Sequence, residues 1–135
     1  TMLKEEGLDN VFERHARLAG AVRQAIVHWG QEGCMELLSE DPREQSNSVT
    51  AVLMADKYNA DDLRASCMQH TNVALAAGLN RFSGKVFRIG HLGDLNEPMI
   101  LGTLSAIEMT LKMTGVDYCP GGTTAAIDFL AERFN

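Results

Sequence analysis

The amphipathic pattern of residues 8–29 is the feature that most constrains how this chain folds. Apolar side chains recur there at steps of three and four residues, at Val11, Leu18, Val22, Ile26 and Trp29. This spacing predicts an α-helix of about six turns with one apolar face. Asp9 or Asn10 fits its N-cap, and Gly30 fits its end. Such a helix must bury its apolar face against a second layer of structure.

The remaining segments carry strand and helix patterns in turn. In chain order, the patterns predict strands at 34–40 and 48–55, a helix at 59–71, an extended piece at 72–79, a strand at 85–90, and helices at 96–114 and 122–134. Asn59 and Asn96 fit helix caps, and the last helix is expected to pack Ile127, Leu130 and Phe134. This order implies an α+β fold, with two or more helices on one face of a small, mostly antiparallel sheet. The 135 residues suffice for one domain, 1–135.

Composition excludes several classes of function. The 18 acidic and 12 basic residues give a net charge of −6 without any basic run, which disfavours a nucleic-acid partner. No apolar run reaches the roughly 18 residues of a membrane span, so we expect no membrane partner. The three cysteines, Cys34, Cys67 and Cys119, are far apart and odd in number. We expect them to be reduced, buried thiols of a cytoplasmic protein.

Arg88 is the most informative position for function. Alternation along its strand places Val86 and Arg88 on the same face. A guanidinium among apolar neighbours needs a partner, because burying it unpaired is costly. The partner is either an internal carboxylate, such as Asp94 or Glu97, or the acid group of a ligand, which the planar guanidinium fork can bind with two hydrogen bonds. The residues alone leave both possibilities open.

The residues that follow Arg88 give weaker signals. Gly90 and Gly93 bracket a turn before a helix, but they match neither the dinucleotide-binding nor the P-loop pattern and favour a tight turn with positive φ. His91, Asp94 and Glu97 have a spacing that a metal site could use, although acids near a helix start are explained by capping and the helix dipole. No serine lies in a nucleophile turn. We therefore assign no catalytic and no metal-binding residue.

The segment "GKVFRIGHLGDLNE", residues 84–97, resembles the C-terminal signature of the class V aminotransferases of PLP fold type I. Within that family it is most similar to the serine–glyoxylate and alanine–glyoxylate enzymes. Segments on both sides resemble the same family in the same order, at 6–26, 46–54, 58–79 and 99–116. The resemblance thus covers nearly the whole chain and implies the family's C-terminal small domain.

The resemblance also implies a function for the parent enzyme. Members of the family move an amino group between a small amino acid, such as serine or alanine, and glyoxylate or pyruvate, through a Schiff base of pyridoxal 5′-phosphate (PLP) with a lysine. In the family, the arginine that matches Arg88 binds the substrate's α-carboxylate. The resemblance further implies a homodimeric, cytoplasmic parent.

The residues that hold PLP belong to the family's large domain. None of the four lysines, Lys4, Lys57, Lys85 and Lys112, stands in the family's lysine motif. We therefore assign no cofactor-binding residue, and we expect the chain alone to be inactive and to hold no PLP.

Some alternatives stay open. The chain could be a stand-alone module that binds a small carboxylate or a protein partner. A cysteine desulfurase-like enzyme ranks lower, because no cysteine lies in a recognisable exposed loop. The segment "GLNRFSGK", residues 78–85, departs from the family's usual loop, which puts the substrate preference in doubt.

Overall fold

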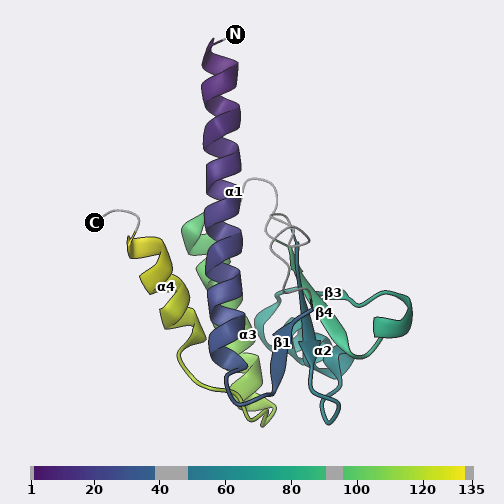
Figure 1. The fold of residues 1–135 in the computed structure, drawn as a ribbon. Coiled ribbons are helices and arrows are strands. Elements are labelled where there is room, and N and C mark those ends of the chain that lie inside the picture. The colour runs from purple at the N-terminus through teal and green to yellow at the C-terminus, as the bar shows by residue number, and fades with distance from the viewer. Residues whose placement is uncertain (1, 39–48, 91–95, 133–135) are drawn as a thin grey trace.

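The computed structural model describes residues 2–38, 49–90 and 96–132, with side chains from residue 13 onward. The elements are α1 (Met2–Trp29), β1 (Met35–Leu37), β2 (Val49–Met54), α2 (Ala60–Thr71), β3 (Ala76–Ala77), a 3₁₀ turn η1 (Asn80–Phe82), β4 (Val86–Gly90), α3 (Glu97–Met113) and α4 (Gly122–Glu132). Helices α3 and α4 lie beside the second half of α1, whereas the first half of α1 extends beyond them (Figure 1).

The four strands form one antiparallel sheet in the order β1-β2-β4-β3, so the predicted α+β class is confirmed. Burial alternates along β2, where Thr50, Val52 and Met54 are buried and the residues between them are partly exposed. The buried face of the sheet packs on the helices. The partly exposed residues of β2 include Ala51, which is paired with Arg88 across β2 and β4.

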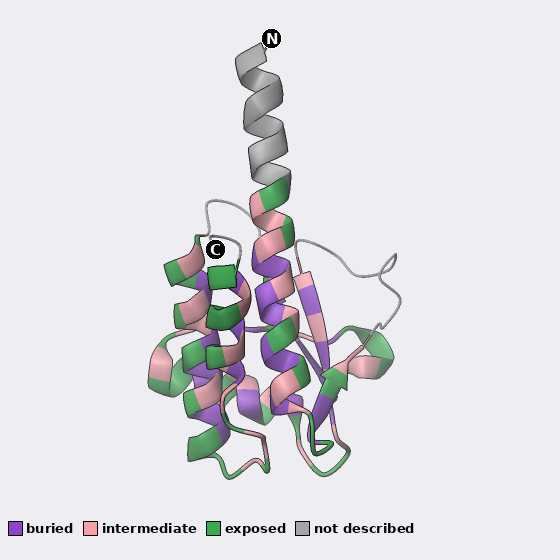
Figure 2. Ribbon diagram, turned by 60° about the vertical axis from the view of Figure 1, so that its left-hand side comes forward, coloured by how far each residue is buried: buried purple, intermediate pink, exposed green. Residues whose placement is uncertain are grey.

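The core is built mainly by facing stripes of α1 and α3. Fully buried apolar residues recur at helical spacing on both, at Leu18, Val22, Ile26 and Trp29, and at Ile100, Leu104, Ile107 and Leu111. Burying each of these side chains contributes about 1.5–3 kcal/mol. Buried positions lie along the inner sides of the packed helices (Figure 2). The apolar periodicity that predicted α1 therefore marks its packed face.

The carboxylate of Glu108 joins three helices. It accepts hydrogen bonds from the indole Nε1 of Trp29 at 3.0 Å, from the backbone N–H of Gly121 at 2.9 Å, and from the N–H and Oγ1 of Thr123 at 3.0 and 2.8 Å. The N–H groups at the start of α4 lack partners within the helix, so a carboxylate from α3 serves as their cap. Burial raises the pKa of Glu108, but these hydrogen bonds outweigh burial, and the net pKa lies below the ordinary value.

The predicted caps of α2 and α3 are present. The side-chain oxygen of Asn59 accepts from the N–H of Asp62, and that of Asn96 accepts from the N–H of Met99, both at 3.0 Å. The predicted start of α1 is wrong, because the helix begins at Met2 and Asp9 lies inside it. Lysine and glutamate are strong helix formers, so a helix can continue through residues that lack apolar periodicity.

The packed face of α4 also differs from the prediction. Ile127 is 45% exposed, whereas Ala126 and Leu130 are buried and Phe134 lies outside the described residues. Small residues determine this face. A Cβ added to Gly122 would lie 2.3 Å from the Trp29 indole nitrogen, so α4 approaches α1 more closely than most side chains permit.

We expect Gly122→Ala to destabilise the chain by about 1–3 kcal/mol, because the added methyl group overpacks against Trp29. Gly102→Ala is the matched control, since a Cβ there meets nothing within 4 Å and replaces a helical glycine. It should stabilise α3 by roughly 0.5–1 kcal/mol. Urea unfolding followed by circular dichroism measures both. Equal stabilities of the two variants would contradict the close approach.

We expect Glu108→Gln to lower the free energy of unfolding at pH 7 by about 1–3 kcal/mol, because an amide presents an N–H group where the second carboxylate oxygen accepted a bond. The depressed pKa of Glu108 stabilises the fold above its unfolded pKa, and this contribution is lost as pH falls through the folded pKa.

The difference between wild type and Glu108→Gln should therefore shrink as pH falls from about 5 to about 3. Glu132→Gln, at an exposed position of α4, is the control and should change little. Urea titrations at several pH values test this. A constant difference across that range would show that the charge of Glu108 is not the cause.

Candidate functional site

A groove opens on the face of the sheet that the helices leave uncovered. Its volume is about 560 Å³, and it is lined by Ala51 of β2, by Val86 and Arg88 of β4, by Leu38, and by residues 78–82. Val86 and Arg88 therefore share a face, as alternation predicted, while Phe87 and Ile89 lie in the core. We call this feature the Arg88 groove.

Small residues beside Arg88 leave space for the groove. In the sheet register Arg88 pairs with Ala51 of β2 on one side and with Ala76 of β3 on the other. Neither methyl group can cover a long side chain on the neighbouring strand. The side chain of Arg88 is therefore flanked on both neighbouring strands by alanine, which leaves space around it.

The third wall is the turn of residues 78–82, which connects β3 to β4. The backbone N–H of Gly78 donates to Val86 O at 3.0 Å, and Asn80 adopts a positive φ of 53°. A Cβ on Gly78 would lie 2.5 Å from Phe82 O, so only glycine fits there. The sequence pattern predicted an extended piece to residue 79 and placed no site residue in this turn. The close spacing of Gly78, Asn80 and Gly84 is the signal that could have indicated it.

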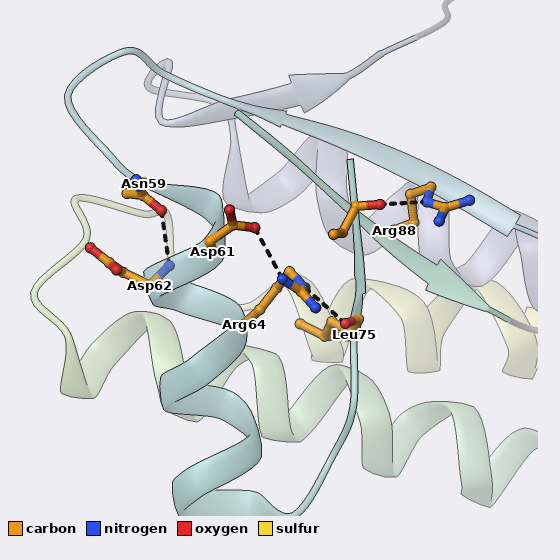
Figure 3. Close-up of polar contacts among 7 residues, drawn as sticks. Asn59, Asp61, Asp62, Arg64, Leu75 and Arg88 are labelled. Carbon is orange, nitrogen blue, oxygen red and sulfur yellow. Dashed lines mark hydrogen bonds and ion pairs between the residues drawn. The ribbon is translucent and has the colours of Figure 1, made fainter. Parts of the chain in front are cut away.

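Arg88 uses one of its nitrogens to fix its side chain. Its Nε donates to the carbonyl oxygen of Ala77 at 2.8 Å, and its guanidinium points away from Asp61 (Figure 3). Within residues 2–38, 49–90 and 96–132, no carboxylate pairs with Arg88. Among the described residues, the two terminal nitrogens of the fork therefore have no acidic partner.

Arg64 of α2 is an arginine whose guanidinium is paired with an internal acid. Its Nε donates to Leu75 O at 2.9 Å, as the Nε of Arg88 does to Ala77 O, but its Nη1 also binds Asp61 at 3.0 Å (Figure 3). Arg64 therefore ties α2 to the segment before β3. Arg88 has the same anchor without the internal acid.

Of the two internal partners considered for Arg88, Glu97 is bound elsewhere. Its carboxylate pairs with Arg17 of α1. The pKa of Glu97 is lowered, first by a hydrogen bond from its own backbone N–H at the start of α3 and then by the hydrogen bond from Arg17. Asp94 lies outside the described residues.

The metal and turn predictions around the signature are mostly untested. Gly93, His91 and Asp94 lie outside the described residues. Gly90 ends β4 without a positive φ, so that part of the turn prediction is wrong, because a strand residue needs no left-handed backbone. Among the described residues, no three side chains of His, Cys, Asp or Glu are placed to hold a metal ion.

Two of the three cysteines lie in buried environments that disfavour a reactive thiolate. All three are free thiols, and Cys34 and Cys67 are buried as predicted, whereas Cys119 is partly exposed. Burial is the largest cause that raises the pKa of Cys34, which disfavours the nucleophilic thiolate. These environments do not support a desulfurase-like reaction.

The lysines do not fit a PLP site in the Arg88 groove. Lys57 is exposed and pairs with Asp117 at 3.4 Å, and Lys85 and Lys112 are also exposed. None of these three lines the groove, and the side chain of Lys4 is not among those described. The described residues therefore provide no lysine for the cofactor at this groove, and we derive no chemical step through it.

The fold defines the class of protein to which this chain is related. The solved pyridoxamine–pyruvate aminotransferase from Mesorhizobium loti matches it with a TM-score of 0.84 and 25% identity, over 98% of this chain and 33% of that one. Together with the sequence relatives below, this match confirms the resemblance of the chain to the C-terminal part of class V aminotransferases. No family model matches the chain.

Among proteins of that class, the chain is similar to glyoxylate-dependent enzymes. It is 44% identical over 132 residues to the serine–glyoxylate aminotransferase of Methylorubrum extorquens, and 36% identical over 121 residues to the L-aspartate–glyoxylate aminotransferase of Paracoccus denitrificans. These matches cover 97% and 90% of this chain. The chain spans about a third of the length of these relatives, with 32% and 30% covered.

None of the helices described in the structure has both the length and the apolar character that crossing a membrane requires.

We expect Arg88→Met to change the free energy of unfolding by about 1 kcal/mol or less, because it removes one hydrogen bond to a carbonyl and an unpaired charge. Arg64→Met is the matched comparison. It removes the same kind of bond and also the pair with Asp61, and should cost roughly 1–2 kcal/mol. Thermal and urea unfolding of both variants check the order, and a larger loss for Arg88→Met would indicate an internal partner for Arg88.

Proposed function

We propose that this chain is the part of a PLP-dependent aminotransferase that binds the α-carboxylate of the substrate through Arg88. The observation that carries the proposal is the guanidinium fork of Arg88, which lines a groove and has no acidic partner among the described residues, in a chain that is 44% identical to a serine–glyoxylate aminotransferase. An amino acid and a 2-oxo acid share one group, the α-carboxylate, so one arginine serves both substrates of a transamination.

The anchor of Arg88 suits it to orientation as well as to affinity. The bond from Nε to Ala77 O restricts the plane of the guanidinium, so the terminal nitrogens meet a carboxylate in one direction. Each hydrogen bond to a charged group contributes about 1.5–3 kcal/mol. Fixing the carboxylate fixes where the bonds at the substrate's α-carbon point, which accelerates a reaction without further contacts.

The rest of the assignment follows from the relatives and is part of the proposal. The donor is a small amino acid such as serine or alanine, and the acceptor is glyoxylate or pyruvate. The cofactor of the whole enzyme is PLP, held by residues other than those of the Arg88 groove. Residues 1–135 form one C-terminal domain of a cytoplasmic homodimer.

A stand-alone carboxylate-binding module is the second candidate. It is favoured by the groove itself, which is formed by this chain without a second body. Calorimetry with serine, alanine and glyoxylate separates the two candidates. Micromolar binding by the 135-residue chain favours the module, whereas its absence favours an enzyme site that needs further residues.

The proposal predicts the behaviour of a chimera in which this chain replaces the aligned third of the M. extorquens enzyme. Arg88→Met in that chimera should lower kcat/KM for serine roughly 30- to 1000-fold, mostly by raising KM. This corresponds to a loss of about 2–4 kcal/mol of transition-state stabilisation. Arg88→Lys should recover only part of the loss, because an ammonium group cannot form the paired bonds.

Lys85→Met is the control. Lys85 directly precedes β4 and is an exposed cation, but it does not line the groove. Steady-state kinetics and retained PLP absorbance are measured for each variant. A folded, PLP-bearing Arg88→Met chimera with unchanged kcat/KM would remove Arg88 from the substrate site.

A further inference from the structure

We infer that the Arg88 groove also binds a substrate with two acid groups, and that Arg81 binds the second one. The inference rests on the proposed function, in which Arg88 binds the α-carboxylate, and it adds a second class of substrate to the monocarboxylates named there: an amino or 2-oxo acid with a carboxylate on its side chain. The residue that determines this preference lies in the turn of residues 78–82, outside the family signature.

Arg81 is a second cation without an acidic partner at the same groove. It lines the groove with Arg88, and within the described ranges it forms no ion pair. Its guanidinium carbon lies 4.9 Å from the centre of the Phe82 ring. A guanidinium over an aromatic face is attracted to the ring and keeps its donors free at its edges. The Phe82 ring therefore positions the Arg81 guanidinium, and no acid among the described residues neutralises its charge.

The turn that carries Arg81 is hydrogen-bonded and not an open loop. Phe82 N–H donates to Leu79 O, and Lys85 N–H donates to Phe82 O, both at 3.0 Å. Gly78 is held close to Phe82 O and Val86, as described above. The backbone of Arg81 thus has a defined position relative to β4, the strand that carries Arg88.

The charged residues that the structure describes at the groove are all basic. Of the described residues that line it, Arg81 and Arg88 are the charged ones, and none is acidic. The chain as a whole carries a net charge of −6, so this local positive charge runs against the composition. Two cations in one concave site raise the local concentration of anions.

The groove that both arginines line has the size of a small-molecule site. Its volume of about 560 Å³ falls within the range of about 300–1,000 Å³ that is usual for small-molecule sites. A monocarboxylate on Arg88 leaves Arg81 to solvent. A dicarboxylate lets both guanidinium groups form charge-assisted hydrogen bonds, which is why we expect it to bind more tightly.

The test compares succinate with monomethyl succinate, a probe of the same chain length in which one acid is esterified. The ¹⁵N-labelled 135-residue chain is titrated with each probe at low, matched ionic strength and pH 7.5, and amide and arginine Nε signals are followed. Succinate should bind roughly five- to tenfold more tightly, beyond the twofold expected from having two acid groups.

Variants assign that ratio to a residue. Arg81→Gln should reduce the ratio to about twofold, and Arg81→Lys, which keeps the charge, should give an intermediate value. Lys85→Gln is the control, because it removes a nearby exposed cation that does not line the groove, and it should preserve the ratio. Arg88→Gln should weaken the binding of both probes.

The outcomes separate this inference from the proposed function. If binding depends on Arg88 but the ratio is unchanged in Arg81→Gln, or if Lys85→Gln lowers it equally, the dicarboxylate inference alone is wrong. If Arg88→Gln leaves the binding of both probes unchanged, the carboxylate-binding role of Arg88 is overturned as well. If neither probe binds, the dicarboxylate inference alone is wrong, because the proposed function allows a site that further residues complete.

Discussion

The carboxylate of Glu108 is the contact on which the arrangement of the helices depends. It gathers the indole of Trp29 at the end of α1 and the N–H groups at the start of α4, while itself belonging to α3. The end of α1 leads directly into the edge strand β1, and β1 pairs with β2, which pairs with β4. The position of the sheet relative to the helices, and with it the direction in which Arg88 faces, therefore follows from a junction of polar groups at the far end of the core.

The groove results from the small side chains on the strands beside Arg88. Apolar side chains of β2 and β4 face the helices, and the opposite face presents alanine on both sides of Arg88. The contrast with Arg64 shows that an arginine in this fold can be closed off by an internal acid when its role is to hold two segments together. Arg88 is likewise anchored through Nε, but within the described residues no acid pairs with its remaining donors. Anchoring one side of a guanidinium while leaving the other side open is a geometry suited to ligand recognition.

Much of this could be predicted from the sequence, since it depends on neighbours along the chain. The periodicity of α1, the caps at Asn59 and Asn96, and the shared face of Val86 and Arg88 are local properties, and the structure has them. The exposed side of Ile127 and the role of Glu108 could not be predicted that way, because they depend on contacts with Trp29, far away in the sequence. The turn of residues 78–82 was missed for a related reason: its shape requires Gly78 to touch Phe82 and Val86. The resemblance to a known family indicated a role for Arg88 that composition and spacing alone left open.

The two arginines of the groove belong to different kinds of backbone element, a strand and a short turn. Arg88 belongs to a strand bonded on both sides, where an insertion would shift every side chain of β4 to the opposite face. Arg81 belongs to a short connection whose backbone requires glycine at its entrance and a positive φ at Asn80 and Gly84, but not a particular side chain at residue 81. Mutation can therefore exchange the residues of that connection while the sheet keeps its pairing. If Arg88 binds the α-carboxylate as proposed, the contact that every amino acid can make is fixed by the pairing of the sheet, whereas the contact that distinguishes one side chain from another depends on a replaceable loop residue.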